Sequence, residues 1–234
     1  ALAASKTGVA LAHVESGLRS FDKTMPEEQN RVVTDHLSDV LFCPTDVAVA
    51  NLAREGIARD VHQVGDVMFD AALMFADAAR TRPGPAAFGL DPRGYVLVTI
   101  HRAAATDTPE ALRALVDVLH AVDRPGVFPV HPRTRAKLIG AGMWDEANAA
   151  PQVRLVGPVG YLDFTALLMR AAAVVTDSGG VQKEAFFHGV PCVTVRDTTE
   201  WTETVDAGYN TLTGLDGARV AAALRGARVP DGPR

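Results

Sequence analysis

The segment TDSGGVQKEA, residues 176–185, places two glycines between an apolar run and an amphipathic one. Gly179 and Gly180 would let the backbone approach a ligand closely, and the free N–H groups of a helix that begins there favour an anion. Ser178 adds a hydroxyl donor. Glu184 lies about one helical turn further on, where a carboxylate repels phosphate but accepts hydrogen bonds from sugar hydroxyls. The pattern indicates a nucleotide site, with phosphate at the turn and ribose on Glu184; a tight strand-to-helix turn without a ligand is the alternative.

Histidine and arginine side chains follow other apolar runs. His101 and Arg102 come after YVLVTI, His131 comes after GVFPV, and the polar run 196–200 comes after PCVTV. Because ligands bind at the carboxyl ends of parallel strands, such groups at several strand ends of one sheet indicate a ligand crevice. Cationic groups there would stabilise a diphosphate, especially as it leaves. A single histidine at a strand end is more often structural.

Three carboxylates in the first part of the chain could carry acid–base chemistry. Glu15 follows the apolar run VALAHV, and Glu27 and Glu28 open a helical segment. Paired carboxylates such as Glu15 and Glu27 are what acid–base chemistry on a sugar carbon needs. Acidic residues in the first turn of a helix also often serve only to complement its dipole, and for Glu28 this alternative has equal weight.

Short apolar runs alternate with amphipathic segments almost throughout, which predicts the framework that positions these groups. The apolar runs are nearly continuous, as in strands covered on both faces. The predicted strands span residues 9–14, 40–44, 61–66, 95–101, 126–131, 153–158, 173–178, 191–195 and 210–214. The predicted helices span residues 27–39, 109–122, 161–172 and 179–189. Thr108 and Pro109 provide an N-cap and a first helical residue, and Gly189 suits a helix C-terminus. This order predicts an α/β fold with mostly parallel sheets and right-handed crossovers.

A segment rich in Pro, Gly and Arg, residues 81–94, interrupts this rhythm and is interpreted as a connection between domains. We therefore expect one domain over residues 1–85 and a second over residues 86–234. The second has enough strands for a complete doubly wound domain. The first has about three strands, so it looks like half of a domain or the tail of one.

The composition narrows the classes of function. The net charge of −5 argues against a broad nucleic-acid or membrane surface. The N-terminal stretch is too short and broken for a transmembrane helix and has no signal-peptide pattern, so we expect a cytoplasmic protein. Cys43 and Cys192 lie in apolar runs and are expected to be buried free thiols. Their number and spacing give no disulfide framework or zinc motif, and no metal site is predicted.

The sequence resembles the bacterial UDP-N-acetylglucosamine 2-epimerases. The matching stretches follow the family order and cover nearly the whole chain: HVESGLRS, MPEEQNRVVTDHLSDVLFCPT, VGDVMFDAAL, VTIHR, FPVHPRTR, YLDFTALL, TDSGGVQKEA, GVPCVTVRDTTEWTETVDAG and NTLTG. The combination of TDSGGVQKEA and RDTTEW is the most specific. The resemblance implies a glycosyltransferase-B-like fold, with two Rossmann-like parallel-sheet domains, the N-terminal one incomplete in this chain, and an active site between them.

The resemblance also implies roles for individual residues. The residues that match the family's UDP-binding turn are Ser178, Gly179, Gly180 and Glu184, with Glu184 on the ribose. His101 matches a catalytic histidine near the diphosphate, and Glu15 and Glu27 match two carboxylates assigned to acid–base work. Arg102, Glu28 and His131 fall near the substrate or near a second, regulatory UDP-sugar site that some members have.

The implied reaction inverts C2 of the sugar. Family members eliminate UDP across C1–C2 to give 2-acetamidoglucal, and UDP then adds back to give UDP-N-acetylmannosamine. Hydrolysing members add water instead and release free N-acetylmannosamine. No metal or redox cofactor is implied, and the family commonly forms dimers, so we expect a homodimer. Two other functions remain open: a glycosyltransferase of the same architecture, and a UDP-sugar-binding protein with weak or no catalysis.

Three departures from the family pattern stand out. The family usually has Glu-Asn one residue after its His-Arg pair, whereas this chain has Ala104 and Ala105 there, which cannot hydrogen-bond to a substrate. These alanines could lower or alter the activity, or they could be a difference that the family tolerates, and we give both interpretations equal weight. Lys183, where an acidic residue is frequent, is interpreted as facing solvent. The family's opening Gly-Thr-Arg-Pro-Glu turn and its Gly-Asp-Thr stretch are not in these residues, so we expect a further segment or a covering partner.

Overall fold

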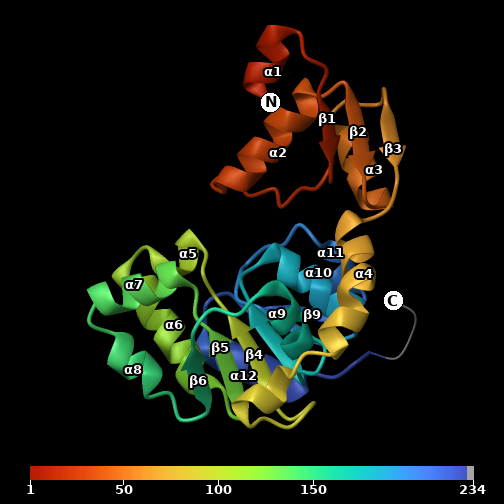
Figure 1. Cartoon of the computed structure of the whole chain (residues 1–234). Helices are drawn as coiled ribbons and strands as arrows, with labels where there is room; N and C mark the ends of the chain where they lie inside the picture. Colours follow the sequence, from red (N-terminus) through yellow and green to blue (C-terminus); the bar gives the residue numbers. More distant parts are fainter. Residues whose placement is uncertain (231–234) are drawn as a thin grey trace. The chain divides into compact units, whose positions relative to one another are not determined.

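A computed structural model of the chain describes residues 1–230 (Figure 1). The chain divides into two compact units, the first Ala1–Ala71 and the second beginning at Ala72. Each unit has its own parallel β-sheet with helices between the strands, which confirms the predicted α/β class. The predicted division of domains at residues 85 and 86 stays a prediction.

The first unit contains a three-stranded sheet in the order β1-β2-β3. Its strands are β1 (Ala12–Val14), β2 (Val40–Cys43) and β3 (Val61–Gln63), and its helices are α1 (Leu2–Thr7), α2 (Pro26–Leu37) and α3 (Asp46–Arg54). The fully buried side chains of Leu41, Cys43 and Leu52 form the centre of its core. Helix α4 (Val67–Arg80) begins in this unit and continues into the second.

The second unit contains a six-stranded sheet in the order β6-β5-β4-β7-β8-β9, and all of its pairings are parallel. The strands are β4 (Val96–Thr99), β5 (Gly126–Pro129), β6 (Val153–Val156), β7 (Ala173–Thr176), β8 (Cys192–Thr194) and β9 (Asn210–Leu212). Counted within the unit, the order is 3-2-1-4-5-6, the doubly wound arrangement that binds nucleotides where the winding reverses. That point lies between β4 and β7, which are neighbours in the sheet.

Helices cover both faces of this sheet. They are the 3₁₀ helix η1 (Gly84–Phe88) and the α-helices α5 (Ala103–Thr106), α6 (Pro109–Ala121), α7 (Pro132–Gly140), α8 (Trp144–Asn148), α9 (Tyr161–Leu168), α10 (Gly179–Phe187), α11 (Thr202–Asp206) and α12 (Gly217–Gly226). Val96 and Val98 of β4 belong to a core cluster that includes residues of α6 and α12. Tyr95 and Leu97 point to the opposite face and belong to a cluster with residues of α9 and α10. Because successive side chains of a strand alternate between faces, burial on both faces explains the nearly continuous apolar runs.

All nine predicted strands and four predicted helices are confirmed, although each of the strands is shorter than predicted. The Thr108 side chain caps α6 by accepting a hydrogen bond from the N–H of Ala111 at 3.1 Å, and Pro109 is the first helical residue. Gly189 has a φ of +64°, the left-handed conformation that follows many helix ends. Phe88 and Leu90, which lie in the predicted connection, pack against the core of the second unit.

Both cysteines are buried and free, as predicted. No helix among residues 1–230 is both long enough and apolar enough to cross a membrane.

Candidate functional site

The N-terminus of α10 is held at the end of β7. Ser178 is the N-cap residue, in an extended conformation, and its backbone N–H donates to the Thr176 hydroxyl at 2.9 Å. The Ser178 side chain makes no capping hydrogen bond to the helix. The first N–H groups of a helix, here those that begin at Gly179 and Gly180, have no partner within it. This end of α10 therefore presents several donors and the positive end of the helix dipole.

Gly179 is required because the loop after β8 packs directly against it. A Cβ atom at Gly179 would lie 2.3 Å from Oε1 of Glu200 and 3.3 Å from Nε1 of Trp201. The Glu200 carboxylate is buried and forms an ion pair with Arg196 at 2.9 Å. The loop is tied to α10 a second time, because the Thr199 hydroxyl donates to the Gln182 side chain at 2.6 Å. The run 196–200, predicted as a polar strand end, thus supports the glycine turn.

Lys183 lies in this support and is 3% exposed, so the prediction that it faces solvent is wrong. Its ammonium group is 2.8 Å from the Glu203 carboxylate of α11 and lies over the Trp201 ring, 4.5 Å from the centroid. The Phe187 ring is 5.2 Å away on the same helix. The prediction failed because α11 and Trp201 cover a face of α10 that its own sequence would leave to water.

His101 follows β4, and its backbone turn is fixed by Asp177 at the end of β7. Oδ2 of Asp177 accepts hydrogen bonds from the N–H groups of His101 at 2.9 Å and Arg102 at 2.7 Å. Asp177 is 1% exposed, and its Oδ1 lies 3.9 Å from Nδ1 of His101. Sequence reasoning did not single out Asp177, although a charged residue directly after a fully buried strand was a signal for such a role.

His131 lies beside His101, with ring centroids 5.5 Å apart and planes inclined by 32°. It is the N-cap residue of α7, and its Nδ1 accepts a hydrogen bond from the N–H of Arg133 at 3.1 Å. The two predicted histidines therefore meet at the carboxyl ends of neighbouring strands β4 and β5. Arg133 is directed to Asp107, with which it forms an exposed ion pair.

A cavity of about 380 Å³ brings together most of the predicted nucleotide-binding residues of the second unit, but neither Arg102 nor Gly179 is part of its lining. It is lined by Thr99, His101, Pro129, His131, Pro158, Val159, Tyr161, Phe164, Ser178, Gly180, Val181 and Glu184. The lining comes from the ends of β4 and β5, the start of α9 and the first two turns of α10. The volume is within the range of small-molecule sites, and the position is the switch point of the sheet.

Glu184 is the acidic side chain in this lining, and its environment is unusual for a carboxylate. Burial raises the pKa of the Glu184 carboxyl to about 7, although an interaction with the Tyr161 hydroxyl acts in the opposite direction. A carboxyl group in such a place is poised between its neutral and charged forms near pH 7. Tyr161 is a second residue that sequence reasoning did not single out.

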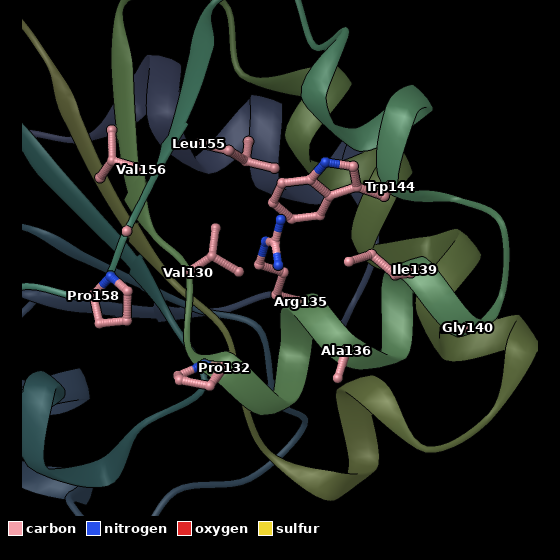
Figure 2. A pocket seen from close by; sticks show the side chains of 11 residues that line it. Val130, Pro132, Arg135, Ala136, Ile139, Gly140, Trp144, Leu155, Val156 and Pro158 are labelled. Atoms are coloured by element: carbon pink, nitrogen blue, oxygen red, sulfur yellow. The ribbon is translucent and has the colours of Figure 1, made fainter.

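A larger cavity, of about 690 Å³, lies between α7, α8 and β6. Figure 2 shows the Arg135 side chain reaching toward the Trp144 ring across it, and the guanidinium carbon lies 4.9 Å from the ring centroid. Apart from Arg135, the lining consists of apolar side chains and glycines. None of the predicted site residues lines this cavity, so its size does not make it the candidate site.

The two alanines after His101 lie in the short helix α5. Ala105 is 4% exposed and packs in the core cluster that contains β4, whereas Ala104 is exposed. Neither residue lines the 380 Å³ cavity. This placement favours the interpretation of these alanines as a tolerated difference.

In the first unit, Glu15 lies in the turn that follows β1. Its φ of +65° is in the left-handed region, which costs a residue other than glycine about 1–3 kcal/mol. Gly17, two residues later, has a φ of +78°, and a Cβ there would lie 2.3 Å from the Ala48 carbonyl oxygen. Strained backbone of this kind is concentrated at functional sites and persists only where neighbouring groups hold it.

Asp35 of α2 is the residue that holds this turn. Its Oδ2 accepts hydrogen bonds from the Gly17 N–H at 3.1 Å and from the Arg19 guanidinium at 2.7 Å, and its Oδ1 lies 2.5 Å from Nδ1 of His13. Burial acts to raise the Asp35 pKa, but the bonds from His13, Arg19 and Gly17 outweigh it and hold the pKa below its usual value. Arg19 also pairs with Glu55, which ties the turn to the end of α3.

Glu27 and Glu28 both lie in the first turn of α2, as predicted, but their environments differ. Glu27 is exposed, whereas Glu28 is 3% exposed. The Glu28 carboxylate accepts hydrogen bonds from the N–H groups of Ser20 and Phe21 and pairs with Arg31 at 2.7 Å. These interactions give Glu28 a structural role within its own unit; its assignment to a regulatory site stays a prediction.

Among residues 1–230, no group of three or more His, Cys, Asp or Glu side chains is arranged to hold a metal ion.

Comparison with known proteins shows the family to which the chain is similar. The sequence profile of the family described as UDP-N-acetylglucosamine 2-epimerase matches residues 1–230. The chain is 50% identical over 220 residues to UDP-2,3-diacetamido-2,3-dideoxy-D-glucuronate 2-epimerase from Pseudomonas aeruginosa, covering 92% of this chain and 59% of that protein. It is 43% identical to UDP-N-acetylglucosamine 2-epimerase from Methanocaldococcus jannaschii, covering 92% of this chain and 61% of that protein. The chain thus spans about three fifths of the length of these relatives.

Solved structures show the same relationship. The M. jannaschii UDP-GlcNAc 2-epimerase in complex with UDP-GlcNAc and UDP matches with a TM-score of 0.89 and 39% identity, over 99% of this chain and 68% of that one. The UDP-GlcNAc 2-epimerase from Neisseria meningitidis bound to UDP-GlcNAc matches with a TM-score of 0.82 and 27% identity, over 96% of this chain and 63% of that one. These neighbours confirm the predicted glycosyltransferase-B-like fold. The chain belongs to the UDP-N-acetylglucosamine 2-epimerase family.

Proposed function

We propose that the protein to which this chain belongs is a UDP-sugar 2-epimerase, and that the 380 Å³ cavity of the second unit binds the UDP part of its substrate. The observation that carries the proposal is the meeting of four groups in one cavity at the switch point of the sheet: the N-terminus of α10, His101, His131 and Glu184. Each has a chemistry that suits one part of a nucleotide diphosphate.

The diphosphate would lie at the N-terminus of α10. The N–H groups of the first helical turn and the Ser178 hydroxyl are donors, and the helix dipole favours the negative charge. His101 and His131 line the same cavity and would stabilise the charge that develops on the diphosphate as it leaves the sugar. Glu184 accepts hydrogen bonds from the ribose hydroxyls. Arg102 follows His101 in the turn that Asp177 fixes, and we assign it to the same end of the substrate.

We infer an elimination–addition reaction. The C2 proton of the sugar is weakly acidic, so loss of UDP from C1 together with the C2 proton is a more accessible route than simple deprotonation. The product is 2-acetamidoglucal, and protonation of C2 on the other face with return of UDP to C1 completes the inversion. Glu15 and Glu27 are assigned to the two proton transfers. The strained backbone at Glu15, held by Asp35, supports a functional role for that carboxylate.

The names of the two curated relatives support a proposal for the substrate class. One acts on a UDP-N-acetylglucosamine and the other on a UDP-2,3-diacetamido-2,3-dideoxy-D-glucuronate, and both sugars carry an acetamido group at C2. We therefore propose a UDP-2-acetamido sugar as the substrate. The hydrolysing reaction, which would release the free 2-epimeric sugar, is the second candidate within this class.

The test is incubation of the full-length protein with UDP-N-acetylglucosamine and with the diacetamido-glucuronate analogue in D2O, followed by proton NMR. A UDP-sugar inverted at C2 and carrying deuterium there would support the reversible epimerase. Free inverted sugar together with UDP would identify the hydrolysing reaction. Binding of UDP without exchange or product from either substrate would contradict the epimerase and leave a binding protein. A dimer is expected, and size-exclusion chromatography with light scattering tests it.

A further inference from the structure

Tyr161 and Glu184 come from different helices and line the same cavity. Tyr161 is the first residue of α9, and its hydroxyl interacts with the Glu184 carboxyl group in the second turn of α10. The Tyr161 ring packs edge-to-face against Phe75, with centroids 5.7 Å apart and an interplanar angle of 81°. An edge-to-face contact of this kind favours one orientation of the Tyr161 ring, although both rings remain partly exposed.

Glu184 has no ion-pair partner among residues 1–230. Lys183 is adjacent in sequence, but its ammonium group is engaged by Glu203. His101 and His131 line the cavity, and His188 lies one turn later on α10, yet none of the three forms an ion pair with Glu184. Much of the remaining lining is apolar: Pro129, Pro158, Val159, Phe164 and Val181. A half-buried carboxyl group without a cation nearby favours its neutral form, which agrees with the pKa of about 7 for Glu184.

We propose that Tyr161 is a positioning residue for Glu184, and that binding of a nucleotide ribose in this cavity displaces a proton from the Glu184 carboxyl group. The inference rests on the proposed function, because it takes the ribose of a UDP-sugar as the ligand. Two ribose hydroxyls that donate to the carboxylate stabilise its charged form, so the proton leaves for the solvent. Hydrogen bonds to a charged acceptor are also stronger than those to a neutral one.

Tyr161 supports this exchange through the charge of Glu184. Its hydroxyl interacts with the carboxyl group and lowers the pKa of Glu184 against the effect of burial. Burial and the nearby Glu184 charge raise the pKa of Tyr161 above its usual value of 10, so the hydroxyl remains a donor between pH 6 and pH 9. Tyr161 acts on the nucleotide through Glu184.

The expected size follows from proton linkage. With a carboxyl pKa near 7 in the free protein and a much lower one in the complex, nucleotide affinity is full at pH 8 and about tenfold weaker at pH 6. The loss of affinity begins as the pH falls through 7, because the neutral acid must then give up its proton before the ribose binds. The release amounts to about half a proton per nucleotide at pH 7 and nearly a whole one at pH 6.

The experiment is isothermal titration calorimetry of the full-length protein with UDP and with 2′,3′-dideoxy-UDP, in buffers of different ionisation enthalpy at pH 6, 7, 8 and 9. The two ligands carry the same phosphate groups, so the difference between them cancels protons that the diphosphate itself exchanges. We expect proton release that depends on the ribose hydroxyls and disappears in Glu184→Gln. In Tyr161→Phe we expect affinity several-fold weaker at pH 7 that recovers to the wild-type value at pH 9.

The variant Glu110→Gln, in the exposed first turn of α6, is the matched control and should behave as wild type at every pH. A merely structural role of Tyr161 would weaken binding by the same factor at all pH values. That result would overturn the inference and leave the proposed function standing. So would equal proton release from UDP and from 2′,3′-dideoxy-UDP, if Glu184→Gln still weakened the binding of UDP. Failure of the wild-type protein to bind UDP at all would overturn both.

Discussion

Replacement of Asp177 by alanine should disrupt the backbone turn that holds His101 and Arg102 at the candidate site. Asp177 accepts the N–H groups of His101 at 2.9 Å and Arg102 at 2.7 Å through one oxygen, and it is 1% exposed. A donor that loses its partner in a buried place costs about 1–3 kcal/mol. Asp177→Ala removes the acceptor of two such donors, and the turn at His101 is only partly buried, so each loss should be near the lower end of that range. We therefore expect Asp177→Ala to lower the free energy of unfolding by about 2–4 kcal/mol.

The same change should weaken UDP binding, because His101 lines the cavity and loses the anchor of its backbone. Asp177→Asn keeps an acceptor but loses the charge, and charge-assisted hydrogen bonds are about twice as strong as neutral ones. Its effect should therefore fall between wild type and the alanine variant. The assay is urea unfolding followed by tryptophan fluorescence, together with calorimetric titration of UDP at constant pH.

Asp107 provides the matched control. It lies six residues after His101 and pairs with Arg133 and Lys137, but its carboxylate is exposed, so its removal should change neither measurement. If Asp177→Ala and Asp107→Ala were both indistinguishable from wild type in unfolding and in UDP affinity, the assignment of Asp177 as the anchor of the site would be refuted.

Three further predictions concern other parts of the structure. Lys183 and Glu203 form a partly buried ion pair, so Glu203→Gln, which leaves the buried ammonium group unpaired, should destabilise the protein by about 1–3 kcal/mol. Lys183→Met should cost less, because the Glu203 carboxylate that it leaves is partly exposed to water, and the double variant should lose less than the sum in a urea-unfolding cycle. Gly179→Ala should weaken UDP binding, because the added Cβ would displace Glu200. Gly160→Ala is the control, since no atom lies within 4 Å of its added Cβ, and UDP affinity measured by calorimetry should fall only in Gly179→Ala. Folding lowers the pKa of Asp35, so the ionised carboxylate stabilises the fold at neutral pH and this stabilisation is lost as the pH falls below about 4. Amide exchange of residues 12–43 should therefore accelerate below about pH 4 in the wild-type protein and much less in Asp35→Asn.

Local patterns predicted the framework well because each depends on neighbours in sequence. The apolar runs gave all nine strands, and the cap at Thr108 and the glycine at position 189 gave helix boundaries. The glycine turn at Ser178 and the glutamate one turn later were also predicted, because both features depend on residue types within one seven-residue segment. The structure adds that these groups share one cavity with two histidines from other strands.

Features that depend on distant segments could not be predicted in this way. Lys183 was misjudged because the side chains that cover it, Trp201 and Glu203, lie about 20 residues further along the chain. Asp177 binds the backbone of residues more than 70 positions earlier, and Asp35 binds a turn about 20 positions earlier. Only the folded chain shows which backbone groups such buried carboxylates serve.

A crystal structure of the full-length protein with UDP tests the central claim most directly. The account predicts that the diphosphate accepts hydrogen bonds from N–H groups in the first turn of α10, beside Ser178 and His101, and that the ribose hydroxyls contact Glu184. Electron density for UDP elsewhere, for instance in the 690 Å³ cavity beside Arg135 and Trp144, with the α10 cavity empty, would contradict it.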